Sequence, residues 1–140
     1  MKFSNKEKLV YRMTAFSKAV DSLETALLLP ISDDRCEIDA AIYRFSLSYE
    51  LAWRTLRSFL LEVYGIAIDS PKEALREAFQ QRLIDDEQVW ISMMEDTNKV
   101  MESFDPKISD YLYEVIKSNY SPVLKKTMLT LKEKFGSESC

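Results

Sequence analysis

Two groups of polar side chains have the residue types and the spacing that binding chemistry requires. In the first group, Glu95, Asn98 and Glu102 follow one another at intervals of three and four residues, so a helix would carry them on one face. An oxygen-rich face of this kind could hold a divalent cation, or meet a nucleotide through such a cation. The alternative is a solvated polar face opposite the core, as on most surface helices.

The second group precedes the first in the chain. Glu50 and Arg54 are four residues apart and Arg57 follows a turn later, which predicts a row of ion pairs on a helix. Exposed pairs of this type each contribute about 0.3–0.5 kcal/mol. Arg44, Glu50 and Arg54 could instead lie partly covered and line a groove, where the planar guanidinium of Arg54 would bind a phosphate through two hydrogen bonds.

Composition excludes most familiar catalytic sites. The chain contains no histidine, so it has no Ser-His-Asp or Cys-His nucleophile, no histidine-ligated zinc and no histidine-based ribonuclease chemistry. Its two glycines are too few for a glycine-rich phosphate loop. Cys36 and Cys140 are far apart and have no metal-binding spacing, which favours reduced thiols. We therefore predict no catalytic residue, no metal and no cofactor.

Charge and hydropathy limit the partners. The chain has 19 basic and 23 acidic residues and a net charge of −4, which disfavours binding to a nucleic-acid backbone. The first residues lack the apolar centre of a signal peptide, and no apolar run is long enough to span a bilayer. We expect a soluble cytoplasmic protein that contacts neither nucleic acid nor membrane.

The elements that must position these groups are all predicted to be helices. Residues that favour helix beginnings occur at Ser4, Asp34, Ser70, Asp85 or Asp86, and Pro106. Residues that end or bend helices occur at Pro30, Gly65, Ser121-Pro122 and Gly136. The prediction is an all-α fold, an antiparallel four- to five-helix up-and-down bundle forming a single domain over residues 1–140, with a frayed tail at residues 136–140.

The helix expected after Asp86 carries a long apolar stripe. Its members recur at helical spacing and comprise Trp90, Met93, Met94, Val100, Met101 and Phe104. This pattern predicts a helix that continues to Phe104 and turns these residues toward the core. Thr97 lies in the same stripe, so we expect it to face inward and to hydrogen-bond its own backbone.

The helix expected between Asp34 and Gly65 is apolar over an unusually wide surface. One stripe comprises Ile38, Ile42, Phe45, Tyr49, Ala52, Leu56, Phe59 and Val63, and a second comprises Tyr43, Leu47, Leu51 and Leu61, with Trp53 and Leu60 at its edges. A surface helix needs only one stripe. Either this helix is central in the bundle, or part of the second stripe meets another chain, and a homodimer is compatible with both explanations.

Four segments resemble a known family in the same order along the chain. Residues 44–56, RFSLSYELAWRTL, are similar to the RFExxYELAWKxL signature of the nucleotidyltransferase substrate-binding proteins. Residues 70–79, SPKEALREAF, resemble the SPREVIREAF segment of that family. Residues 83–90 resemble its LIDD…W turn, and residues 93–98, MMEDTN, resemble its MLxDRN segment. The resemblance covers nearly the whole chain.

This resemblance implies a helical bundle of the wider HEPN group that forms homodimers. Such a protein is typically encoded beside a minimal nucleotidyltransferase, whose substrate the helical partner is thought to bind. Other HEPN members are toxin ribonucleases whose partner acts as the antitoxin. Those active members carry an Arg-x4-6-His motif, often continued to a tyrosine that the partner modifies with a nucleotide.

The present chain departs from that motif. Alignment on Asp96 and Asn98 places Thr97 at the arginine, Glu102 at the histidine and Phe104 at the tyrosine. Glutamate cannot act as both neutral base and cationic acid near pH 7, and phenylalanine has no hydroxyl group to accept a nucleotide. The resemblance without the motif favours a binding protein without catalytic activity.

Three functions remain open at this stage. The chain could be a non-catalytic subunit that pairs with a minimal nucleotidyltransferase and helps to bind its nucleotide or acceptor substrate. It could also be a toxin–antitoxin component derived from an inactive or divergent ribonuclease, or a structural homodimer without a ligand. The polar residues of the two most similar segments are the predicted contacts with a partner or substrate, namely Arg44, Glu50, Arg54, Asn98 and Glu102.

Overall fold

The computed structural model describes residues 4–138, and helices account for most of them. The elements are α1 (Asn5–Leu28), α2 (Cys36–Tyr64), α3 (Pro71–Gln80), α4 (Glu87–Thr97), α5 (Pro106–Val115) and α6 (Ser121–Glu138). A 3₁₀ turn, η1 (Val100–Glu102), follows α4, and a π turn, η2 (Ile116–Tyr120), joins α5 to α6. Residues 4–138 contain no strand. The all-α prediction is confirmed.

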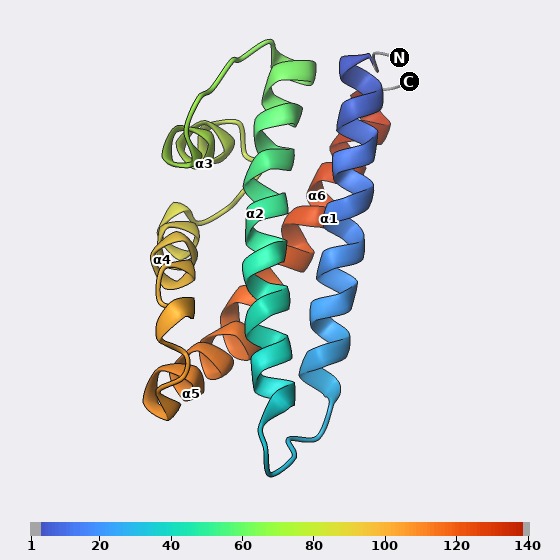
Figure 1. The fold of residues 1–140 in the computed structure, drawn as a ribbon. Helices are drawn as coiled ribbons and strands as arrows, with labels where there is room; N and C mark the ends of the chain where they lie inside the picture. The colour runs from blue at the N-terminus through green and yellow to red at the C-terminus, as the bar shows by residue number, and fades with distance from the viewer. Residues whose placement is uncertain (1–3, 139–140) are drawn as a thin grey trace.

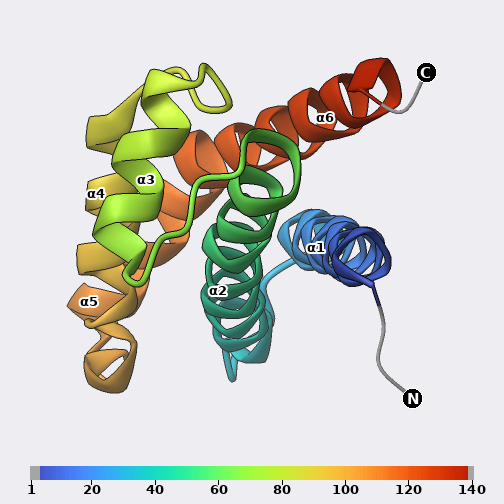
Figure 2. The same cartoon turned by 90° about the horizontal axis from the view of Figure 1, so that it is seen from above.

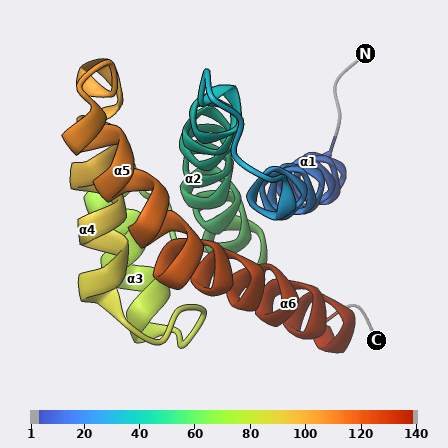
Figure 3. The same ribbon diagram turned by 90° about the horizontal axis from the view of Figure 1, so that it is seen from below.

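Helix α2 is the central element of the bundle. Helix α1 runs antiparallel along one side of α2, and α3, α4 and α5 form a layer on the opposite side (Figures 1 and 2). Helix α6 crosses the bundle and contacts both α1 and α2 (Figure 3). This position explains why the first apolar stripe of α2 is buried from Ile38 to Phe59, because neighbours cover it from three sides.

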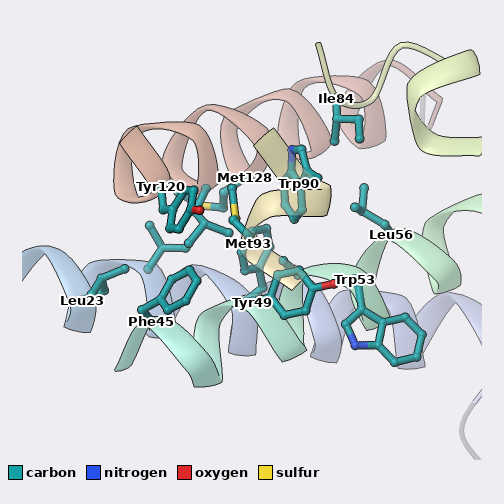
Figure 4. Packing of buried hydrophobic residues seen from close by; sticks show 14 of the residues in the cluster. Leu23, Phe45, Tyr49, Trp53, Leu56, Ile84, Trp90, Met93, Tyr120 and Met128 are labelled. Atoms are coloured by element: carbon teal, nitrogen blue, oxygen red, sulfur yellow. The ribbon is translucent and has the colours of Figure 1, made fainter. Parts of the chain in front are cut away.

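Large side chains of α2, α4 and η2 meet in the core. Phe45 of α2 stacks on Tyr120 of η2, with ring centroids 5.2 Å apart. Tyr49 of α2 packs against Trp90 of α4, with centroids 6.3 Å apart, and Met93 lies beside them (Figure 4). Each fully buried side chain of this size contributes about 1.5–3 kcal/mol. The core therefore fixes α4 and η2 against the middle of α2.

Short-range capping contacts confirm most of the predicted helix boundaries. The hydroxyl groups of Ser4 and Ser70 accept hydrogen bonds from the backbone N–H groups of Glu7 and Glu73. The carboxylate of Asp86 accepts from the N–H groups of the first turn of α4. Gly65 ends α2 with φ 71°, a left-handed conformation that glycine adopts without strain.

The beginning of α2 was predicted incorrectly. Asp34 is not the N-cap, because the helix begins at Cys36 after Arg35, which has φ 61°. The Asp34 carboxylate instead accepts hydrogen bonds from the Ser32 hydroxyl group and the Cys36 backbone N–H. The Glu37 carboxylate turns back to the backbone N–H of Ser32 at 2.7 Å. These side chains therefore stabilise the loop rather than cap the helix.

The prediction for the end of α4 was also wrong. Helix α4 stops at Thr97, and Met101 and Phe104 are 88% and 85% exposed instead of lying in the core. The hydroxyl group of Thr97 donates to the backbone carbonyl oxygen of Met94, a local bond that competes with the helical ladder. The predicted backbone contact of Thr97 is thus confirmed, although the helix ends at this residue.

The Ser121-Pro122 segment bends the chain without interrupting it. Proline has no N–H group, and its ring collides with the carbonyl group four residues earlier in a regular α-helix. The turn before it therefore widens, and the Ser121 N–H donates to the carbonyl oxygen of Ile116, five residues back. Figure 3 shows the change of direction between α5 and α6. Helix α6 continues past Gly136 to Glu138, and residues 139–140 of the predicted tail lie outside the described residues.

Within residues 4–138, each helix is either too short or too polar to span a bilayer.

Candidate partner-binding groove

A surface groove of about 340 Å³ lies between the N-terminal half of α2 and the η1 region. We call it the α2–η1 groove. Its walls are formed by Asp39, Ile42, Tyr43, Ser46, Leu47 and Glu50 of α2, together with Val100 and Ser103. Successive turns of α2 place these residues along one edge of the helix, and the early end of α4 brings the chain back against that edge.

Large apolar side chains are exposed in and beside the groove. Tyr43 and Leu47 of the second α2 stripe are 66% and 41% exposed. Met101 and Phe104 extend from the same short segment that supplies Val100 and Ser103 to the wall. Large apolar side chains exposed at a groove are typical of an interaction surface.

The charged residues that line the groove are both acidic, Asp39 and Glu50. The Glu50 carboxylate accepts a hydrogen bond from Trp53 Nε1 at 2.7 Å and pairs with Arg54 at 3.4 Å. The guanidinium groups of Arg54 and Arg57 lie 5.6 and 5.5 Å from the Trp53 ring centroid. The predicted Glu50–Arg54 pair is therefore present, whereas Arg57 contacts the Trp53 ring and makes no ion pair within the described residues.

The structure separates the five predicted contact residues. Glu50 lines the α2–η1 groove, and Arg54 lies one turn further along α2. Arg44 is half-buried on the side that faces α1, where its guanidinium donates to the backbone carbonyl oxygen of Ser22 at 2.8 Å. Arg44 therefore joins two helices and lies outside the groove.

Asn98 and Glu102 are exposed but do not share a helix face. Asn98 follows the last residue of α4, and Glu102 is the last residue of η1. The predicted common face of Glu95, Asn98 and Glu102 is wrong, because that spacing applies only to a continuous helix. Both Asn98 and Glu102 nevertheless belong to the segment that carries Val100 to the groove.

The three positions of the degenerate motif form no catalytic arrangement. The Thr97 hydroxyl group is occupied by the carbonyl oxygen of Met94 at 2.7 Å. Glu102 and Phe104 are exposed, and neither side chain makes a hydrogen bond or an ion pair within the described residues. Among residues 4–138, these side chains present no paired acid and base.

A buried carboxylate that sequence reasoning missed holds the η1 segment in place. Asp96 is 3% exposed and accepts hydrogen bonds from the hydroxyl groups of Tyr111 at 2.8 Å and Tyr120 at 2.5 Å. Its second oxygen pairs with Lys99 at 3.1 Å, and the Lys99 ammonium group lies 4.9 Å from the Tyr111 ring centroid. The sequence carried a signal, because Asp96 follows Met93 by three residues and so shares its buried face.

The Asp96 cluster is built for positioning and not for proton transfer. Burial and the hydrogen bond to Asp96 raise the pKa values of Tyr120 and Tyr111, so both hydroxyl groups stay protonated and continue to donate. The hydrogen bond to Asp96 raises the pKa of Lys99, which keeps its positive charge. The cluster ties the end of α4 to α5 and η2 and thereby sets where the chain emerges toward the groove.

A second group of ligand-type side chains lies in the loop before α2. Asp34, Cys36 and Glu37 each offer one oxygen or sulfur atom, and these three atoms lie within 4.8 Å of one another. The Cys36 thiol donates to the Glu37 carboxylate at 3.1 Å, and this contact raises the pKa of the thiol. A protonated thiol is a poor metal ligand, and these contacts account for the geometry of the loop without an ion.

Comparisons with known proteins give an independent assignment. Residues 11–133 match the family described as nucleotidyltransferase substrate binding protein like. No curated protein matches the sequence. The fold is similar to that of a crystal structure of ttk003001694 from Thermus thermophilus, with a TM-score of 0.76 and 24% identity over 83% of this chain and 98% of that chain. Because the family match spans most of its length, the chain belongs to the nucleotidyltransferase substrate binding protein like family.

Proposed function

We propose that this protein is a non-catalytic subunit that pairs with a separately encoded minimal nucleotidyltransferase and helps to bind its nucleotide or acceptor substrate. The observation that carries this proposal is the family match over residues 11–133. The α2–η1 groove supports it, because exposed apolar side chains beside polar ones provide both affinity and orientation for a partner. Of the predicted contacts, Glu50 lines this groove and pairs with Arg54, and Asn98 and Glu102 each lie two residues from Val100 in the sequence.

Self-association is part of the same proposal. Of the exposed members of the second α2 stripe, Tyr43 and Leu47 line the α2–η1 groove, whereas Leu61 lies beyond it near the end of α2 and suits a contact in a symmetric homodimer. A Leu61→Asp variant should sediment as a monomer at tens of micromolar, where the unmodified chain should be a dimer. Leu28→Asp is the matched control, because Leu28 is 84% exposed but lies at the far end of α1. A monomeric unmodified chain would contradict the dimer.

The pairing is tested by co-expressing the chain with the minimal nucleotidyltransferase encoded beside it. We expect the two to purify as a complex, and we expect Arg54→Ala to weaken partner or nucleotide binding by about 1–3 kcal/mol without loss of helical signal. Isothermal titration with nucleoside triphosphates should show tighter binding to the complex than to either chain alone. The absence of a complex, together with unchanged nucleotide affinity, would refute the function. If Arg54→Ala instead unfolds the bundle, Arg54 is a structural residue and not a contact.

A ribonuclease role is the second candidate, and the geometry of the motif segment argues against it. The positions that carry arginine, histidine and tyrosine in active HEPN members hold Thr97, Glu102 and Phe104, and they form no acid–base pair here. We expect the purified chain to leave RNA intact with or without divalent cations. Metal-dependent cleavage that disappears in a Glu102→Gln variant would overturn this assignment.

A further inference from the structure

We infer that the α2–η1 groove binds an amphipathic helix whose apolar side chains are flanked by lysine or arginine, and that the nucleotidyltransferase subunit supplies this helix. The inference rests on the proposed function for the identity of the partner. The chemistry of the occupant rests on the groove alone.

The apolar part of the argument comes from exposure. Met101 and Phe104, in the segment that carries Val100 and Ser103 to the groove, are the most exposed large apolar side chains described, at 88% and 85%. Tyr43, which lines the groove on α2, is 66% exposed. The Asp96 cluster anchors the end of α4, five residues before Met101, and so holds the backbone that leads to these side chains. Large exposed apolar side chains on an anchored backbone offer a partner apolar area to bury.

The charge of the groove indicates which charged residues should flank the apolar side chains of the bound helix. Both charged wall residues, Asp39 and Glu50, are acidic, and the charged residues between positions 100 and 105 are Glu102 and Asp105. Glu50 is already paired with Arg54, whereas Asp39, Glu102 and Asp105 make no ion pair within the described residues. The basic side chains Arg35 and Lys99 of the neighbouring segments are paired with Asp110 and Asp96. The surface is therefore apolar with an acidic border, and a cationic amphipathic segment complements it.

The segment that binds in the groove should be a helix and not a strand. Residues 4–138 contain no strand, so a peptide cannot add its backbone to a sheet edge here. The groove runs between a long helix and a single 3₁₀ turn, and an amphipathic helix fills such a groove with side chains spaced three and four residues apart.

A second groove on the same chain provides an internal control. It lies between α1 and α6 and has nearly the same volume, about 350 Å³. It is also lined by apolar residues, Val10, Met13 and Phe135, but its charged residues are Lys18 and Lys132. A ligand attracted by apolar surface alone should not distinguish the two grooves, whereas a cationic helix should avoid the basic one.

The probe is a synthetic amphipathic peptide of about 14 residues, with leucines at helical spacing and lysines on the other face. Its counterpart has glutamate at every lysine position. In NMR titrations of the full chain, the lysine peptide should shift the resonances of the α2–η1 groove and not those of the α1–α6 groove. The Asp39→Lys variant and the Met101→Ala/Phe104→Ala variant should each weaken its binding by about tenfold or more. Asp33→Lys and Leu28→Ala are the matched controls and should leave the affinity unchanged.

Several results would overturn the inference. These are equal binding of the lysine and glutamate peptides, shifts centred on the α1–α6 groove, or unchanged affinity in the two groove variants. Conversion of a dimer into a monomer by Met101→Ala/Phe104→Ala, with no effect of the peptide on the dimer, would assign the surface to a second copy of this chain. The same variants applied to the co-expressed complex separate the two proposals. If the complex still forms with these variants, the groove is not the docking site, and the proposed pairing with the nucleotidyltransferase stands. If the lysine peptide binds but no complex forms, the proposed pairing fails and the peptide-binding groove stands.

Discussion

Removing the hydroxyl group of Tyr120 should destabilise the protein, whereas removing that of Tyr49 should not. Tyr120 is 1% exposed and donates to Asp96 at 2.5 Å. Tyr49 is equally buried, at 3% exposed, but its hydroxyl group has no hydrogen-bond partner within the described residues. Each Tyr→Phe substitution deletes one oxygen atom from a buried ring and preserves its packing. The comparison therefore isolates the hydrogen bond.

The magnitudes follow from what each hydroxyl group contacts. In Tyr120→Phe, Asp96 keeps Tyr111 and Lys99, so the loss is one hydrogen bond to a charged acceptor, about 1.5–3 kcal/mol. At roughly 3–4 °C per kcal/mol for a chain of this size, the melting temperature should fall by about 5–12 °C. In Tyr49→Phe, the substitution removes a buried polar group that has already lost its hydration, so stability should stay equal or rise by up to about 1 kcal/mol.

Urea unfolding followed by circular dichroism at pH 7 measures both differences in the free energy of unfolding, provided that the slope of this free energy against urea concentration is the same in all variants. Tyr113→Phe is the control, because this ring is also buried but its hydroxyl group makes no hydrogen bond within the described residues. Its stability should stay within about 0.5 kcal/mol of the unmodified protein. Equal stability of Tyr120→Phe and the unmodified chain, or an equal loss in Tyr49→Phe, would refute the reasoning.

Three further outcomes follow from the structure. Hydrogen bonds from Ser32 lower the pKa of Glu37 from 4.5 to about 2. The ionised Glu37 side chain therefore contributes fully to stability above pH 4.5, and this contribution is lost as the pH falls toward 2. Glu37→Gln should lower the urea midpoint at pH 7 but not at pH 2. Gly65→Ala should cost about 1–2 kcal/mol in urea unfolding from backbone strain alone, because a Cβ atom there meets open space while φ is +71°. Met101→Ala and Phe104→Ala should each change the melting temperature by less than about 2 °C, and a larger loss would mean that these side chains are buried.

Local sequence determined where most of the helices begin and end. The hydroxyl groups of Ser4 and Ser70 and the carboxylate of Asp86 cap N–H groups two or three residues away, and Gly65 supplies the conformation that ends α2. Contacts over so few residues depend little on the rest of the chain, which is why composition and spacing were sufficient to predict them. At Asp34, a competing contact with Ser32 within the same loop displaced the cap.

Part of the candidate site could also be predicted, because residues 44–56, which resemble the family, supply Ser46, Leu47 and Glu50 to the α2 wall of the groove. Helical spacing placed Tyr43 and Leu47 on a second stripe of α2, and the structure leaves both exposed. Spacing did not indicate that Arg44 faces α1, where the backbone of Ser22 accepts its hydrogen bond. The sequence pattern describes which residues share a face, but the neighbour that covers a face comes from a distant part of the chain.

The end of α4 shows most clearly what only the tertiary structure decided. The apolar pattern continues from Trp90 to Phe104, yet the helix stops at Thr97 and exposes the last two apolar residues. Asp96 is held by tyrosines 15 and 24 residues further along the chain, on α5 and η2. A buried carboxylate has lost its hydration and requires hydrogen-bond donors in place of water, so the position of those tyrosines fixes where the chain can turn. That requirement appears only when the helices are packed together, because the partners are adjacent in space and not in sequence.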